Sequence, residues 1–238
     1  MIRTIRNHGY DRSVSRRLTL LLVVALVVPA LALAAPGEPK EQFTAADQRK
    51  AASIVLKSRD FAAGWNRIPS TPEDDERLSC PGYNPDESDL ILTGKATAEF
   101  QRSGGVPTLQ SFSNVYRTKA NAVASWTRSV KPALARCAAE IFKKQLASTG
   151  AKATILRQGA IAFPKVAPRT AAFRVALRIT VQQNGQSQTV PITVHLIALG
   201  NGRGDSGLIT VAVGNGVPLA ELRAFATVTA SRLAAAKL

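Results

Sequence analysis

Histidine and cysteine are scarce in this sequence, and each occurs only twice in 238 residues. His8 lies near the start, so His195 is the only histidine in the rest of the chain. There is no phosphate-binding glycine loop, HExxH motif, CxxC pair or dinucleotide fingerprint. These absences leave no signal for the common zinc, nucleotide or thiol-redox sites, and we expect no cofactor and no metal.

Aromatic residues are also few, at 5% of the chain, and they are not interleaved with lysine and arginine. Proteins that bind single-stranded nucleic acid usually stack bases on aromatic side chains within a basic groove. Although the formal net charge is +15, we therefore expect no nucleic acid as a partner.

The first 34 residues have the three-part pattern of a secretory signal peptide. Five arginines precede an apolar run that begins at Leu18 and leads into the small residues Ala32 and Ala34. This order of basic, apolar and cleavage regions predicts removal of residues 1–34. A membrane anchor is the alternative, because residues 18–37 carry no charge and are about long enough to span a bilayer.

Several details of this leader favour a cleaved, secreted or cell-wall-associated product. Pro29 and the alanine-rich end of the run favour cleavage, which would leave no transmembrane helix in the mature chain. Arg16 and Arg17 partly resemble a twin-arginine signal, but the expected aromatic residue after the pair is missing, which favours the general secretory route. No cysteine follows the run, so there is no lipid attachment site.

Charge is divided unevenly along the remaining chain. Residues 35–99 carry 8 basic and 12 acidic side chains, whereas residues 100–238 carry 18 basic and 3 acidic ones. Such a positive field attracts anionic partners, including acidic lipid surfaces and wall polymers. The alternative is that the arginines only keep the protein soluble.

The two cysteines, Cys80 and Cys137, are predicted to form a disulfide, as is usual in an exported chain. The chain-entropy model values a bridge over so long a loop at roughly 4 kcal/mol. It would anchor a loop rich in proline and acid, predicted over residues 65–89. The acidic residues of this loop suggest calcium, but the EF-hand spacing is absent, so a solvated acidic loop is the preferred interpretation.

The elements after the leader predict an α+β fold with the order α-β-β-α-β-β-β-β-α. Consecutive strands joined by short turns imply an antiparallel sheet of about six strands with three flanking helices. We expect a flexible segment at 35–43 and a single domain at 44–238. The helices are expected over 44–62, over 119–148 and from Pro218 onward, and the strands near 96–103, 108–117, 153–163, 173–182, 187–196 and 206–213.

The central helix, over 119–148, is the longest stretch of helical periodicity. Pro132 is expected to kink it or divide it in two. Its apolar stripe is predicted to pack on the core and consists of Val123, Trp126, Val130, Leu134, Cys137 and Ile141.

A hairpin around Asn184-Gly185 is the clearest local signal. A two-residue turn places Ile179 opposite Val190 and Phe173 opposite Leu196, so that one face is wholly apolar. The other face gathers polar side chains that suit a carboxylate, phosphate or sulfate. This candidate ligand site consists of Arg174, Arg178, Thr193 and His195. A solvated outer face is the alternative, and Arg174 should discourage protonation of His195.

Two short motifs in the strand near 206–213 suggest chemistry but lack support. Gly204-Asp205-Ser206-Gly207 has the look of a serine-protease nucleophile segment, yet His195 is the only available base and a strand partner near Thr210 suits it better. Arg203-Gly204-Asp205 matches the tripeptide that integrins recognise, but these residues also suit a turn. We expect no catalytic residues and no enzymatic activity.

The chain between Asp60 and Cys137 resembles the exported actinobacterial domains of the PknH-like extracellular sensor type. The resemblance rests on Asp60-Phe61-Ala62-Ala63-Gly64-Trp65, on Cys80 and Cys137, on Asp89-Leu90-Ile91-Leu92-Thr93-Gly94-Lys95-Ala96 leading into Phe100, and on Val115-Tyr116-Arg117-Thr118. It implies a secreted or wall-facing α+β module that binds or senses a ligand and has no catalytic centre. PsbP-like sandwich proteins are a looser comparison, by element order alone.

The sequence therefore predicts an exported, non-catalytic binding or sensor-like domain of the cell envelope. Its partner would be an anionic or amphipathic envelope component or a partner protein. A secreted hydrolase acting on envelope material and a structural secreted protein without a small ligand are the alternatives. The sequence gives no indication of the oligomeric state.

Overall fold

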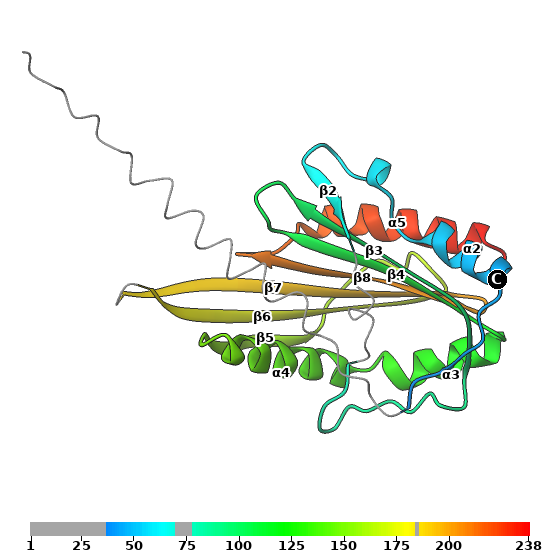
Figure 1. The fold of residues 1–238 in the computed structure, drawn as a ribbon, viewed down its shortest axis with the longest axis horizontal. Helices are drawn as coiled ribbons and strands as arrows, with labels where there is room; N and C mark the ends of the chain where they lie inside the picture. The colour runs from blue at the N-terminus through cyan, green and yellow to red at the C-terminus, as the bar shows by residue number, and fades with distance from the viewer. Residues whose placement is uncertain (1–36, 70–77, 184–185) are drawn as a thin grey trace, which may run out of the picture.

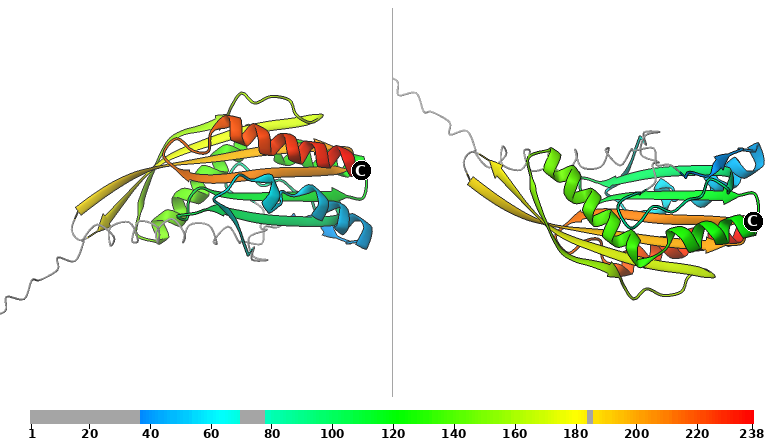
Figure 2. Two further views of the ribbon diagram at one scale, coloured as in Figure 1. Left: turned by 90° about the horizontal axis from the view of Figure 1, so that it is seen from above. Right: turned by 90° about the horizontal axis from the view of Figure 1, so that it is seen from below.

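The computed structural model describes residues 37–69, 78–183 and 186–238. Within them, eight strands form one mixed, mostly antiparallel sheet with the order β1-β3-β4-β8-β7-β6-β5, and β2 pairs with β3 outside that path. Helices α4 and α3 cover one face of the sheet, and α5 and α2 cover the other (Figures 1 and 2). The predicted α+β class is confirmed, and the sheet is antiparallel as predicted except where β1 pairs with β3 in parallel. The predicted leader and the turn at Asn184-Gly185 lie outside the described residues.

The elements are more numerous than predicted. The strands are β1 (Lys40–Glu41), β2 (Trp65–Ile68), β3 (Ile91–Arg102), β4 (Thr108–Tyr116), β5 (Lys152–Ala160), β6 (Arg169–Gln183), β7 (Gln186–Asn201) and β8 (Gly204–Val213). The helices are α2 (Ala45–Ile54), α3 (Lys119–Ser129), α4 (Pro132–Ser148) and α5 (Leu219–Ala235), with a 3-10 turn η1 (Ser58–Asp60). The prediction of six strands and three helices missed β1 and β2 and treated α3 and α4 as one helix.

The long hairpin of β6 and β7 has the predicted register. Gln183 pairs with Gln186, Ile179 with Val190 and Phe173 with Leu196. His195 pairs with Thr210 of β8, as expected. The alternation of apolar and polar residues fixes this register, because a slip by one residue would move every apolar side chain to the other face.

Each face of the sheet packs on its own apolar core. On one face, α4 contributes Ala138, Phe142 and Leu146 to a core with β5, β6 and β7. On the other, Phe225, Ala226 and Leu233 of α5 pack with residues of β3, β4, β7 and β8. The sheet is therefore the middle layer between two helical layers, as Figure 2 shows.

Pro132 divides the predicted central helix, because it is the first residue of α4 and the chain leaves the helical conformation just before it. The break also changes which side of α3 faces the core. Ala122 and Ser125 are buried there, whereas Val123 is 40% exposed. The expectation of one continuous stripe from Val123 to Ile141 is therefore wrong for its first part.

The first helix is shorter than predicted. Thr44 caps it as expected, since its hydroxyl accepts a hydrogen bond from the Asp47 amide at 3.1 Å. The helix ends at Ile54 instead of near residue 62, because the chain turns extended to bury Val55 and Leu56 as well.

Short strands occupy two segments that were predicted to be irregular. Lys40 and Glu41, within the predicted flexible segment, pair in parallel with Ile91 and Leu92 of β3. Trp65, the first residue of the predicted acidic loop, begins β2 and pairs with Arg102 of β3. Across the described ranges, no helix is long and apolar enough to cross a membrane.

Candidate functional site

A cavity of about 290 Å³ lies on the face of the sheet that α3 and α4 cover. Helix α4 packs against β5 and β6, and α3 packs against β4 and β8. Floor residues include Gln110, Phe112 and Ile209. Val130 and Leu134, at the junction of α3 and α4, form part of the wall. The cavity is mostly apolar and partly open to solvent.

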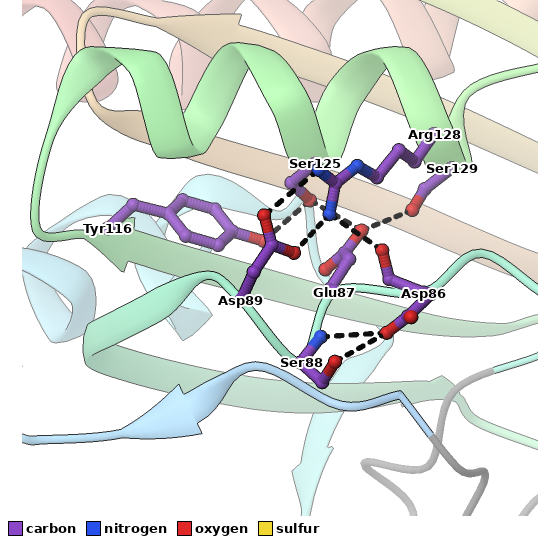
Figure 3. A network of polar contacts seen from close by, with 8 residues as sticks. All are labelled: Asp86, Glu87, Ser88, Asp89, Tyr116, Ser125, Arg128 and Ser129. Carbon is purple, nitrogen blue, oxygen red and sulfur yellow. Dashed lines mark hydrogen bonds and ion pairs between the residues drawn. The ribbon is translucent and has the colours of Figure 1, made fainter.

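The segment before β3 closes one side of the cavity through a buried carboxylate, that of Glu87. Only 4% of Glu87 is exposed. Its Oε1 accepts hydrogen bonds from the hydroxyls of Ser125, at 2.9 Å, and Ser129, at 2.6 Å. The hydroxyls of Ser125 and Tyr116 lie 2.7 Å apart, which extends the network to β4 (Figure 3). The two serines lie one helical turn apart on α3 and hold the carboxylate at the cavity wall.

The neighbouring acidic residues are directed to other partners. The Ser88 amide and hydroxyl donate to Asp86, which lowers the pKa of that carboxyl. Arg128 binds Asp89 and lowers its pKa in turn (Figure 3). Asp86, Glu87 and Asp89 therefore do not converge on one point. In the part of the chain that the structure describes, no cluster of acidic, histidine and cysteine residues could hold a metal ion.

Asp205, whose side chain is 13% exposed, is the second carboxylate of the cavity. Arg169 of β6 donates to its Oδ1 at 2.9 Å, and the same nitrogen of Arg169 lies 3.2 Å from the Gly204 carbonyl oxygen. Burial raises the pKa of Asp205 to about 7 against the opposing effect of Arg169, and the negative charge of Glu87 adds to the rise. Asp205 therefore titrates near neutral pH despite its ion pair.

Aromatic side chains line the same cavity from three directions. Tyr83 comes from the segment before β3, Tyr116 from β4 and Trp126 from α3. The Arg169 guanidinium lies 5.8 Å from the centre of the Trp126 ring. Trp126 was predicted as core, but it is only partly buried and lines the cavity.

The predicted disulfide between Cys80 and Cys137 is confirmed, with Cα atoms 5.7 Å apart. Cys80 and Tyr83 exchange two backbone hydrogen bonds of 2.9 Å. The Tyr83 hydroxyl donates to the Ser129 carbonyl oxygen at 2.7 Å. The disulfide thus fastens one wall of the cavity to α4.

The four residues of the predicted hairpin site lie on the opposite face of the sheet. Thr193 and His195 are each only 2% exposed. The Thr193 hydroxyl donates to the Gly214 carbonyl oxygen at 2.7 Å, and Gly216 packs so closely that a Cβ there would lie 2.8 Å from His195 Cε1. Arg174 is half-buried and Arg178 is exposed. The turn after β8 therefore covers part of this group, and no open surface unites all four residues.

The protease-like segment Gly204-Asp205-Ser206-Gly207 lies in β8, next to the strand that carries His195. Burial, and then the charge of Arg174, lower the pKa of His195 to about 4, as the sequence predicted in direction. Ser206 pairs with Leu199, four residues along β7 from His195, a separation of about 13 Å along the strand. The Ser206 hydroxyl instead donates to the Phe112 carbonyl oxygen at 2.5 Å.

The residues of the cavity are mostly those that sequence reasoning passed over. Glu87 was one of several acids in a predicted surface loop, and Asp205 belonged to a tripeptide that suited a turn. No spacing connects them, because they lie 118 positions apart and meet only through the sheet and α3. No known protein family matches this chain, and no curated protein is significantly similar to it in sequence.

Proposed function

We propose that this protein is a non-catalytic binding domain that takes a small amphipathic ligand into the cavity between the sheet and the α3–α4 layer. The observation that carries the proposal is the cavity itself, mostly apolar and with the carboxylates of Glu87 and Asp205 at its wall. Small-molecule sites typically combine an apolar lining with a few convergent polar groups. At about 290 Å³ the cavity suits a compact ligand, near the lower end of such sites.

The proposal includes export to the cell envelope. A disulfide is typical of oxidising compartments, and Cys80 and Cys137 form one here. The basic and apolar pattern of residues 1–34 gives independent support from the sequence. The domain would then meet its amphipathic ligand at the envelope, as the resemblance to PknH-like sensor domains also implies.

Of the two ligand classes expected from the sequence, anionic and amphipathic, the cavity favours the amphipathic one. The expected anion site on the hairpin is partly covered, whereas the cavity is accessible and apolar. A hydrolase is less favoured, because His195 and Ser206 lie far apart along their strands.

The proposal is tested by thermal unfolding with octylamine, octanol and octanoate, which share an eight-carbon chain and differ in head group. A ligand at a hundred times its Kd adds about 2.7 kcal/mol to the free energy of unfolding. Ala198→Leu and Ile209→Phe are two independent variants that fill the cavity, and Ala52→Leu adds the same bulk at an exposed position on α2.

We expect at least one probe to raise the Tm of the native protein and of Ala52→Leu, but not of the cavity-filling variants. Failure of all three probes to raise the Tm would contradict the proposal and favour a structural protein without a small ligand. An equal rise in a cavity-filling variant that folds would contradict it too, because the probe would then bind elsewhere.

A further inference from the structure

We propose that the ligand of this cavity carries a cationic ammonium group, which Asp205 and Glu87 bind while the apolar walls hold the rest of the molecule. The inference rests on the proposed function and specifies the chemistry of its ligand. It predicts that octylamine binds best of the three probes named above. This prediction can therefore be wrong even if the protein binds ligands in the cavity.

The charged residues that line the cavity are mostly acidic. Among the residues that the structure describes, the lining includes four acids and one lysine, Lys95; the acids are Glu38, Glu41, Glu87 and Asp205. Lys95 lies 3.8 Å from Glu41, so its charge is already partly matched. The protein as a whole carries a net charge of +15. Three of the four acids belong to the acidic segment 35–99, whereas Asp205 comes from the basic part of the chain. An acidic lining favours entry of a cation over an anion.

Two of these carboxylates, Glu87 and Asp205, line the same cavity. The charge of Glu87 contributes to the raised pKa of Asp205, so the two groups interact. Arg169 is the ion-pair partner of Asp205, and its nitrogen is shared with the carbonyl oxygens of Gly202 and Gly204. A cation placed between Asp205 and Glu87 would favour the ionised form of Asp205 and offset the cost of its burial.

The aromatic walls suit the same group. An ammonium group is attracted to aromatic faces, and the attraction is stronger where water is excluded. Tyr83, Tyr116 and Trp126 line the cavity together with the two carboxylates. Trp126 already lies beside the Arg169 guanidinium, so this wall accommodates a positive charge.

Calorimetric titration with octylamine and octanoate tests the inference, since the two probes carry opposite charges on the same chain. We expect octylamine to bind at least about tenfold more tightly, because a charge-assisted hydrogen bond contributes about that factor. Asp205→Asn and Glu87→Gln should each reduce this preference by about tenfold. Glutamine at position 87 keeps an oxygen for Ser125 and Ser129, so this variant tests charge even if Asp205→Asn does not fold.

Glu140→Gln, at an exposed position on the outer side of α4, is the matched control and should leave the preference unchanged. Equal or tighter binding of octanoate, abolished by Ala198→Leu, would overturn the cationic assignment and leave the binding function intact. A preference for octylamine that survives both Asp205→Asn and Glu87→Gln would overturn the assignment of these carboxylates. Failure of every probe to bind would overturn both proposals.

Discussion

Arg169 reaches Asp205 across the strand that lies between them, with a hydrogen bond of 2.9 Å to Oδ1. The register places Gly200 of β7 between the two residues. A Cβ at Gly200 would collide with both side chains, so glycine is required for the contact. An ion pair normally lowers the pKa of an aspartate, but the desolvation of Asp205 outweighs Arg169 and raises it to about 7.

The raised pKa of Asp205 predicts a specific pH dependence of stability. Between about pH 4 and pH 7 the folded state holds a proton at Asp205 that the unfolded state has lost, so Asp205 lowers the free energy of unfolding as the pH rises through this window. Asp205→Asn removes that slope. Arg169 and Glu87, the charged groups facing it from β6 and the segment before β3, remain in place.

We therefore expect the Tm of Asp205→Asn, relative to the native protein, to increase from about pH 4 to pH 7 and to level off at higher pH. Differential scanning calorimetry at several pH values measures this, with Glu140→Gln as the exposed control. A Tm difference that stays constant with pH would contradict the assigned pKa.

The lowered pKa of His195 predicts that the free energy of unfolding changes with pH in the opposite direction. Its pKa of about 4 in the folded state lies below the ordinary value of 6.5, so the unfolded state binds the extra proton between these values. The contribution of His195 to the free energy of unfolding therefore rises as the pH increases from about 4 to 6.5. His195→Gln should be more stable, relative to the native protein, at pH 5 than at pH 7, as measured by urea unfolding. The reverse order would show that His195 is charged in the folded protein.

The side-chain contacts of Arg203 are predicted to be among the most important at the surface for the stability of the folded protein. It donates to both carboxylate oxygens of Asp47, at 2.6 and 2.8 Å, and to the Tyr116 carbonyl oxygen at 2.8 Å. These contacts join α2 to the turn before β8 and to the end of β4, and they lower the pKa of Asp47. Arg203→Ala should cost about 2–4 kcal/mol, since it leaves Asp47 mostly buried and without this partner.

Arg178→Ala is the control for that substitution, because Arg178 is exposed. It should change stability by less than about 0.5 kcal/mol. Equal losses in urea unfolding of the two variants would contradict the role of Arg203. The same ion pair bears on the Arg203-Gly204-Asp205 tripeptide, because each of its charged side chains binds a partner within the protein.

Reduction of the disulfide should release the cavity wall before it affects the long hairpin. The segment that Cys80 anchors contains Leu78, Tyr83 and Glu87, which line the cavity, whereas β6 and β7 are held by fifteen paired positions. Limited proteolysis of the reduced protein should therefore cut within residues 78–90 first. Probe binding should weaken in parallel, in the reduced protein and in Cys80→Ser. Earlier cleavage within the β6–β7 hairpin would contradict this order.

Local patterns were sufficient to predict the hairpin but not the short strands. The alternation from Phe173 to Val181 and the Asn184-Gly185 pair fixed the register of β6 and β7. β1 has two residues and β2 has four, and neither has an apolar alternation of its own. Both strands pair along the edge of β3 that β4 does not occupy. Their pairing therefore depends on a tertiary contact that no local sequence pattern encodes.

The candidate site could not be predicted from the sequence, for a related reason. Pro132 correctly predicted a break in the central helix, but not the change of face that exposes Val123 and turns Ser125 toward Glu87. The arginines and His195 on the hairpin were conspicuous in the sequence, yet the turn at Gly214 and Gly216 covers Thr193 and His195. The cavity forms where residues of α3, α4, the segment before β3 and the sheet meet, and this is a property of packing.

Trp126 provides the most direct test of the claim that the cavity is the ligand site. The chain has two tryptophans, and Trp65 packs in the core on the other face of the sheet. Trp65→Phe therefore leaves Trp126 as the only indole, and Trp126 lines the cavity. Titration of this variant with octylamine should change the tryptophan emission saturably, with the calorimetric Kd, and the change should vanish when Ala198→Leu is added. Unchanged Trp126 emission while calorimetry records binding would place the ligand elsewhere and contradict the account.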